Sequence, residues 1–269
     1  MNRLLCFDYD MTLLDHATGE VPDSTLRAID LLRPQWKIVI ATGRDMAQPE
    51  STYGLTTVHP DAVVEMNGAR IRAEGKILYR YYLPQALLQT VILFGRQQKM
   101  CISCVKDGIY YTTDSSLLES FVHTCVRKEK IQVRPAEQVF GQPVSALTLV
   151  GSEPEARLLE QRFPQVRVPL FGKKRGADII PRTLSKAEGV RRLLDYYDSD
   201  FSSVMFFGDS GNDLELIKAA SIGVAMGNAI EPVKRSADYV TSAVGDNGIW
   251  NALRHFHLLP AAEKQDEKA

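Results

Sequence analysis

Residues 3–7 read RLLCF and residues 37–41 read KIVIA, and these two short apolar runs decide the fold. Such continuous apolar runs are typical of strands that are buried on both faces of a parallel sheet. Between them, residues 23–33 place apolar side chains at the spacing of an amphipathic helix. With a further apolar run at 62–66, the pattern predicts a βαβαβ opening and an α/β fold with a Rossmann-like parallel sheet.

The same alternation returns near the C-terminus. We expect helices at 185–197, from Asn212 onward and around 247–256, and strands at 203–207 and 222–225. These elements look like the second half of the same sheet. They predict that residues 1–82 and 181–269 form one discontinuous core domain.

The middle of the chain has a different pattern. Glu74-Gly75 indicates a hairpin turn between 71–72 and 77–81. Beyond it we expect helices at 84–98, 115–128 and 153–163, and strands at 101–105, 109–112, 144–150, 166–170 and 177–180. Helices combined with hairpins favour an antiparallel sheet covered on one face, so we predict an inserted α+β domain at 83–180.

Composition and charge exclude several classes of protein. The 269 residues are 45% hydrophobic and 24% charged, as in globular proteins, and 32 Lys+Arg balance 33 Asp+Glu. A net charge of −1 provides no general attraction for nucleic acid or anionic lipid, so a small ligand is favoured. No apolar run approaches the roughly 18 residues that cross a membrane, and Asp8 interrupts the first run too early for a signal peptide. The oligomeric state has no sequence signal.

Four cysteines in a chain of this length are too few for a disulfide framework. We interpret them as thiols of a cytoplasmic protein. Cys101 and Cys104 form a C-x-x-C pair, with His123 and Cys125 following, so a zinc site is an alternative. Two residues three apart on a strand point to opposite faces, however, which disfavours that alternative.

Four short polar segments adjoin apolar strands where an open α/β sheet has its ligand crevice, outside the carboxyl ends of the strands. In sequence order they are DYDMT at 8–12, ATGR at 41–44, SKAE at 185–188 and GDSGND at 208–213.

In the first segment, Asp8 and Asp10 lie two residues apart directly after a buried strand. Holding two carboxylates there is costly unless a cation or a shared proton relieves them. One is suited to act as a nucleophile and the other as an acid. The alternative is that the pair only caps a turn.

The next two segments suit an anion. The Thr42 hydroxyl and the unshielded Gly43 amide can bind an oxyanion, although Thr-Gly is also an ordinary strand exit. Ser185 and Glu188 have the form of a capping box, which places Lys186 in the first turn of a helix. There an ammonium and free amides would bind an anion together, and a solvated lysine is the alternative.

The fourth segment suits a hard cation. Asp209 and Asp213, with the Asn212 amide nearby, offer the oxygen ligands that Mg²⁺ prefers. A glycine-rich turn is the alternative.

Taken together, D-x-D-x-T, T-G, K and G-D-x-x-N-D, in this order, resemble the motifs of the haloacid dehalogenase superfamily, which consists largely of Mg²⁺-dependent phosphohydrolases. The insertion resembles the C2-type cap of that superfamily. The stretch Asn67-Gly68-Ala69 is similar to the N-G-A turn of its Cof-like branch, and we also count Asn67 as a candidate substrate residue.

The resemblance implies a role for each motif residue. Asp8 would attack phosphorus and form an aspartyl-phosphate, while Asp10 would protonate the leaving oxygen and then deprotonate water. Mg²⁺ would be held by Asp8, the Asp10 carbonyl and Asp209, with Asp213 in support. The phosphoryl group would be bound by Thr42, Gly43, Lys186 and Asn212, with Asn212 also orienting Lys186.

In the superfamily that the motifs resemble, phosphatases and phosphomutases have an acid two residues after the nucleophile, and dehalogenases lack it. Asp10 therefore implies a phosphatase or a phosphomutase. The sequence departs from the usual motif at Met11, where glycine is common.

Lys173, Lys174 and Arg175, between Gly172 and Gly176, would contact the part of the substrate that is not transferred, or form a solvated turn. We expect a phosphatase of small phosphorylated metabolites, with sugar phosphates as the first candidates. A phosphomutase using the same aspartate is the alternative, and a catalytically idle binding module has no support from the motifs.

Overall fold

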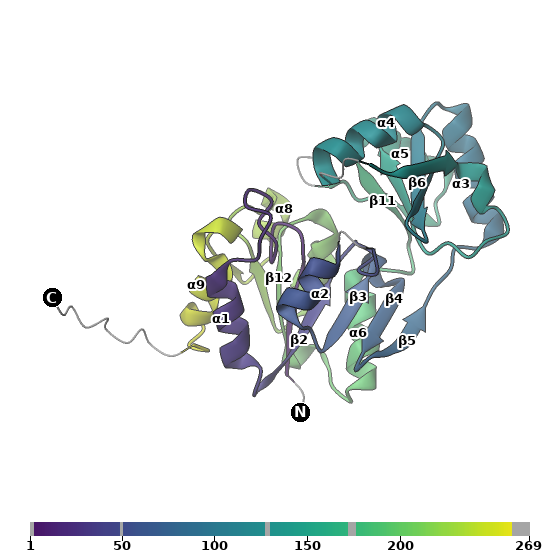
Figure 1. Cartoon of the computed structure of the whole chain (residues 1–269). Helices are drawn as coiled ribbons and strands as arrows, with labels where there is room; N and C mark the ends of the chain where they lie inside the picture. The colour runs from purple at the N-terminus through teal and green to yellow at the C-terminus, as the bar shows by residue number, and fades with distance from the viewer. Residues whose placement is uncertain (1–2, 49–50, 127–129, 172–175, 260–269) are drawn as a thin grey trace.

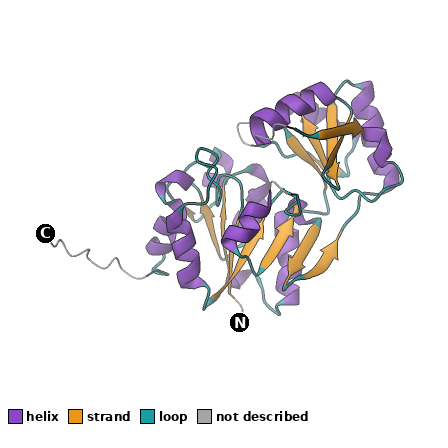
Figure 2. Cartoon of the chain, viewed as in Figure 1, coloured by secondary structure: helices purple, strands orange, loops and turns teal. Residues whose placement is uncertain are grey.

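The computed structural model describes residues 3–48, 51–126, 130–171 and 176–259, with the side chains of 125 and 126 left out. The chain forms two lobes, each a sheet flanked by helices (Figures 1 and 2). We call them the core and the cap. The core holds the first five strands and the C-terminal part, and the cap holds the strands between them.

The core sheet has eight strands in the order β14-β13-β12-β1-β2-β3-β4-β5. From β14 to β3 all neighbours are parallel, and β4 and β5 add an antiparallel hairpin. The strands are β1 (Arg3–Phe7), β2 (Trp36–Ala41), β3 (Ala62–Glu65), β4 (Arg70–Ala73), β5 (Lys76–Arg80), β12 (Val204–Gly208), β13 (Ile222–Ala225) and β14 (Tyr239–Val240). The predicted α/β fold with a Rossmann-like sheet is confirmed.

Helices cover both faces of the core sheet. On β1, Leu5 and Phe7 pack in one apolar cluster with α1, α2 and α9, whereas Leu4 and Cys6 pack in another with α6, α7 and α8. Burial on both faces is the reason that β1 is apolar without alternation. The helices are α1 (Asp23–Leu32), α2 (Thr52–Val58), α6 (Lys186–Tyr196), α7 (Leu214–Ala219), α8 (Glu231–Lys234) and α9 (Gly248–His255), with short helical turns η2 (Met66–Gly68), η5 (Phe201–Ser203), η6 (Gly211–Asp213) and η7 (Val244–Asp246).

The cap sheet has six strands in the order β10-β11-β9-β6-β7-β8. They are β6 (Cys101–Lys106), β7 (Ile109–Thr112), β8 (Gln132–Pro135), β9 (Leu147–Val150), β10 (Val166–Arg167) and β11 (Ala177–Pro181). The helices are α3 (Gln85–Gln97), α4 (Ser115–Phe121) and α5 (Glu153–Arg162), with the helical turns η3 (Val122–Val126) and η4 (Ala136–Val139).

The cap differs from its prediction in two respects. Helices α3 and α5 cover one face of the sheet, but α4 packs on the opposite face through Leu118, so the sheet is not covered on one face alone. Strand β8 was not predicted, and it pairs with β7 in parallel. Its sequence, QVRP, has no apolar pattern that marks a strand.

The two cysteines of the C-x-x-C pair lie on opposite faces of β6. Cys101 belongs to the cluster around α4, and Cys104 to the cluster under α3 and α5. They are therefore not placed to bind one metal ion together.

Two segments connect the lobes, one after β5 and one between β11 and α6 (Figure 1). The core hairpin ends at Arg80 and the cap sheet at Pro181. The division at 82/83 and 180/181 remains our proposal. Among the described residues, no helix has the length and apolarity needed to cross a membrane.

Candidate active site

The site lies where the order of the core sheet reverses. Strand β1 lies between β2 and β12, which pair with it in parallel, and the connections from β1 and β12 run to opposite sides of the sheet. Such a reversal leaves a crevice at the carboxyl ends of the strands. Asp8 directly follows β1, and Asp209 directly follows β12.

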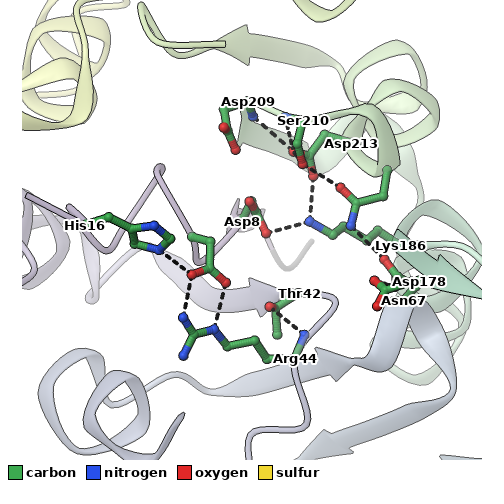
Figure 3. A network of polar contacts seen from close by, with 12 residues as sticks. Asp8, His16, Thr42, Arg44, Asn67, Asp178, Lys186, Asp209, Ser210 and Asp213 are labelled. Carbon is green, nitrogen blue, oxygen red and sulfur yellow. Dashed lines mark hydrogen bonds and ion pairs between the residues drawn. The ribbon is translucent and has the colours of Figure 1, made fainter. Parts of the chain in front are cut away.

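A buried lysine joins two aspartates in this crevice (Figure 3). The Lys186 Nζ lies 2.5 Å from Asp8 Oδ1 and 2.7 Å from Asp213 Oδ1. Their exposed fractions are 1% for Lys186, 4% for Asp8 and 0% for Asp213. Burial lowers the pKa of Lys186, but Asp213 and Asp8 outweigh it and hold the pKa above its usual value, so the ammonium stays charged.

The start of α6 positions this lysine. Ser185 is the N-cap, and its side chain accepts a hydrogen bond of 3.0 Å from the Glu188 N–H. The helix therefore begins at Lys186, as the S-x-x-E pattern predicts, with the lysine in the crevice.

A tight loop holds the other acids. Asp213 Oδ2 accepts hydrogen bonds from the backbone N–H of Asp209, at 3.0 Å, and of Ser210, at 2.9 Å. Position 208 must be glycine for this packing, because a Cβ there would lie 2.7 Å from Asp213 Cβ. The loop thus holds Asp213 against the end of β12 and leaves Asp209 beside Asp8.

These carboxylates fit a divalent cation. One oxygen each from Asp8, Asp209 and Asp213 lies within 4.8 Å of the others, and among the described residues Asp209 Oδ1 is buried without a hydrogen-bond partner. Burial, with Asp8 and Asp213 nearby, raises the pKa of Asp209 to about 9. Burial, with Asp213 nearby, raises the pKa of Asp8 to about 7. One ammonium does not balance three carboxylates, and a hard cation would.

The Asp10 side chain is outside this cluster. Its carboxylate accepts hydrogen bonds from Arg44 Nε at 2.7 Å and Arg44 Nη2 at 2.6 Å, and its Oδ1 lies 2.6 Å from His16 Nε2. Burial raises the pKa of Asp10, but Arg44 and His16 outweigh it and hold the pKa well below its usual value. Sequence reasoning assigned no role to Arg44 or His16. The position of Arg44 directly after Thr42-Gly43 could have indicated a role in the site, whereas nothing in the sequence around His16 indicated one.

The backbone conformation at Met11 explains why glycine is common at this position of the motif. Its φ is +59°, in the left-handed region where glycine has no steric cost. The loop is held nevertheless, because the Met11 N–H donates to the Leu14 carbonyl and the Met11 carbonyl accepts from Asn228 Nδ2 at 2.8 Å.

The Thr-Gly segment lies beside Asp8 at the end of β2. The Thr42 side chain is buried, and its Oγ1 accepts a hydrogen bond of 3.1 Å from the Arg44 N–H. A Cβ at Gly43 would lie 2.7 Å from Asp178 Oδ2, so a larger residue there would displace the Asp178 side chain from its present position.

Asn67 and Asn212 are joined by a hydrogen bond, whereas Lys186 Nζ donates to Asp8 and Asp213. Asn212 Nδ2 donates to Asn67 Oδ1 at 2.8 Å, and Asn67 Nδ2 donates to Asp178 Oδ2 at 2.7 Å. Asp213 thus holds the Lys186 ammonium directly, and the role of Asn212 in orienting Lys186 stays a prediction. Asp178, on cap strand β11, was missed by sequence reasoning because it belongs to no recognisable motif. Lys173, Lys174 and Arg175 lie outside the described residues.

Comparisons with known proteins agree with this geometry. The family of haloacid dehalogenase-like hydrolases matches residues 5–253. The Bacillus subtilis 5-amino-6-(5-phospho-D-ribitylamino)uracil phosphatase YitU is 26% identical, over 95% of this chain and 98% of its own.

Two solved structures are also similar. A sugar phosphatase of subclass IIB of the superfamily superposes with a TM-score of 0.87 at 26% identity, covering 96% of this chain and all of its own. A phosphatase of the superfamily from Bacteroides thetaiotaomicron gives 0.86 at 28% identity, covering 96% of each chain. The chain therefore belongs to the haloacid dehalogenase-like hydrolase family, as a Cof-like phosphatase that acts on phosphoric monoesters.

Proposed function

We propose that this chain is a Mg²⁺-dependent phosphatase that hydrolyses small phosphorylated metabolites, sugar phosphates first, through an aspartyl-phosphate on Asp8. The observation that carries the proposal is the buried contact of Asp8, Lys186 and Asp213, with Asp209 adjacent, at the reversal of the core sheet.

Asp8 acts as the nucleophile. Its Oδ1 is held by Lys186, which leaves Oδ2 to attack phosphorus. The new bond joins Asp8 to phosphorus while the bond from phosphorus to the leaving oxygen breaks. Water then attacks phosphorus, releases inorganic phosphate and restores the carboxylate. Lys186, Thr42 and the Gly43 N–H bind the phosphoryl oxygens, so the charge that develops there meets fixed donors.

Asp10 transfers the protons. It protonates the leaving oxygen in the first step and accepts a proton from the attacking water in the second. The Arg44 and His16 contacts stabilise the charged carboxylate, so Asp10 must leave these contacts and take up a proton before it donates to the leaving oxygen. The proton that it later accepts from water restores this protonated form. These contacts give Arg44 and His16 a positioning role.

Asp8, Asp209 and the Asp10 carbonyl would hold Mg²⁺, with Asp213 in support. When bound, the cation would offset the repulsion between the anionic nucleophile and the phosphate dianion. This repulsion is about 4 kcal/mol per charge pair at 4 Å and an effective dielectric of ~20.

The substrate class rests on the relatives. YitU is named for a phosphoribitylamino compound, and the subclass IIB neighbour is a sugar phosphatase. We place the substrate of this chain among such small phosphorylated compounds. Asn67, Lys173, Lys174 and Arg175 are our candidates for contacts to the part of the substrate that is not transferred.

A screen of phosphorylated metabolites tests the proposal, with Mg²⁺ present and D8N as the blank. We expect phosphate release from sugar phosphates, none after EDTA treatment, and recovery when Mg²⁺ is added. Ca²⁺ should inhibit, because it prefers longer bonds and more oxygen ligands. Full activity in EDTA, or equal activity in D8N, would refute the proposed function.

A further inference from the structure

The cap reaches the active site through β11. On this strand Ala177 and Ile179 belong to the apolar cluster of the cap. Because successive side chains on a strand point to opposite faces, Asp178 points away from that cluster. Its carboxylate meets Asn67 of the core at 2.7 Å (Figure 3). The reaction described above assigns Asp178 no role.

A chain of hydrogen bonds continues from Asn67 to the loop of acids. Asn67 Oδ1 accepts from Asn212 Nδ2 at 2.8 Å, and Asn212 Oδ1 accepts from the Ser210 hydroxyl at 2.7 Å. The Ser210 N–H then donates to Asp213 Oδ2 at 2.9 Å. In this series of hydrogen bonds, each side-chain amide donates on one side and accepts on the other. The Asp178 carboxylate, which only accepts when charged, therefore sets the direction of every hydrogen bond in the series.

The backbone holds Asn67 in an unfavourable conformation. Met66 has φ +48° and Asn67 has φ +53°, both in the left-handed region, where non-glycine residues cost about 1–3 kcal/mol. Two hydrogen bonds of 3.0 Å secure them, from the Met66 N–H to the Arg44 carbonyl and from the Asn67 N–H to the Thr42 carbonyl. The strained turn therefore ties Asn67 to the phosphate-binding segment.

Gly43 makes room for the contact. A Cβ at this position would lie 2.7 Å from Asp178 Oδ2 and 3.3 Å from Asn67 Nδ2. The missing side chain thus allows a cap carboxylate to approach the end of β2 closely.

We propose that Asp178 is a positioning residue of the reaction, which fixes the Asn67 amide and, through Asn212 and Ser210, the loop that carries Asp209 and Asp213. The inference rests on the proposed function. The inference makes the geometry of the loop that carries Asp209 and Asp213 depend on a residue of the cap. The reaction should therefore be fastest when Asp178 on β11 contacts Asn67.

A double-mutant cycle tests the inference with p-nitrophenyl phosphate and a sugar phosphate. D178A removes the acceptor and should lower kcat about tenfold for both substrates, with little change in KM, because the hydrogen bond that orients the Asn67 amide is lost. D178N keeps an acceptor for Asn67 Nδ2 and should stay within about threefold of the wild type. The N67A/D178A double variant should be no slower than N67A, because both changes break the same series of hydrogen bonds.

R167A is the matched control. Arg167 on the cap strand β10 forms an ion pair with Glu215 on α7 and donates to the Leu184 carbonyl, so it joins cap and core without touching Asn67. Its effect should add to that of N67A. Mg²⁺ titrated calorimetrically without substrate gives a second readout: D178A should bind it more weakly than the wild type, and R167A equally well.

Three results would overturn the inference: additive losses in the N67A/D178A cycle, a D178N variant as slow as D178A, or losses confined to the sugar phosphate, which would make Asp178 a substrate contact instead. Failure of the proposed function is distinguishable, because it would show as no Mg²⁺-dependent turnover in the wild type or as turnover in D8N.

Discussion

The core and the cap place their charged residues differently. At the carboxyl end of the core sheet, Asp8, Lys186 and Asp213 contact one another almost out of reach of solvent. The cap instead buries apolar clusters on both faces of its sheet, and Asp178 is the residue that it brings to Asn67 at the joint. We infer from this comparison that the core carries the proposed reacting groups, and we propose that the cap positions them and contacts the substrate.

The largest effect on stability is expected for K186M in the core. Removing the ammonium leaves Asp8 and Asp213 buried beside each other, and breaking a buried ion pair costs about 3–5 kcal/mol. We expect a corresponding fall in the free energy of unfolding, and a loss of at least ~10²–10³-fold in kcat from the missing phosphate donor. Urea unfolding and steady-state kinetics measure the two effects.

K106A in the cap is the control for that variant. Lys106 pairs with the exposed Asp107 next to it, and such surface pairs contribute about 0–1 kcal/mol. Equal losses of stability in K186M and K106A would contradict the contrast between a reacting core and a covering cap.

D10N should leave the fold stable and have an effect on kcat that depends on the substrate. General acid–base catalysis contributes ~10²–10⁴-fold, and p-nitrophenolate leaves with little protonation. We therefore expect kcat to fall further for a sugar phosphate than for p-nitrophenyl phosphate. Equal losses for the two substrates would remove Asp10 as the acid.

The smallest effect is expected in the cap, for Lys173, Lys174 and Arg175 changed together to Ala. Contacts to a remote group of the substrate act only on substrates that carry it. We expect kcat/KM to fall roughly ten- to a hundredfold for the preferred metabolite, since charged contacts contribute ~1.5–3 kcal/mol, and to stay unchanged for p-nitrophenyl phosphate. Small, equal effects on both substrates would favour a solvated turn.

The sequence predicted which polar residues of the core lie close together because of how parallel sheets are built. Uninterrupted apolar runs mark the buried strands, and the polar residues that directly follow them meet at one edge. Asp8 and Asp209 were located in this way, and the S-x-x-E cap located Lys186 at the start of its helix.

The contacts between domains were beyond the same reasoning. Asp178 lies between apolar residues in the middle of β11, and its contact with Asn67 depends on how the two lobes pack, which no local pattern records. The hydrogen bonds around Asn212 also depend on this packing. The Asn212 amide meets Asn67, while Asp213, one residue later, faces the lysine.

Trapping the covalent intermediate tests the central claim most directly. The wild-type enzyme is mixed with Mg²⁺ and a sugar phosphate, quenched in acid within a single turnover, and digested for peptide mass analysis. We predict an acid-stable, hydroxylamine-labile phosphoryl group on the peptide that contains Asp8, and none in D8N. Phosphate released at the normal rate with no phosphoryl group on Asp8 at any quench time, or with one on another residue, would contradict the account.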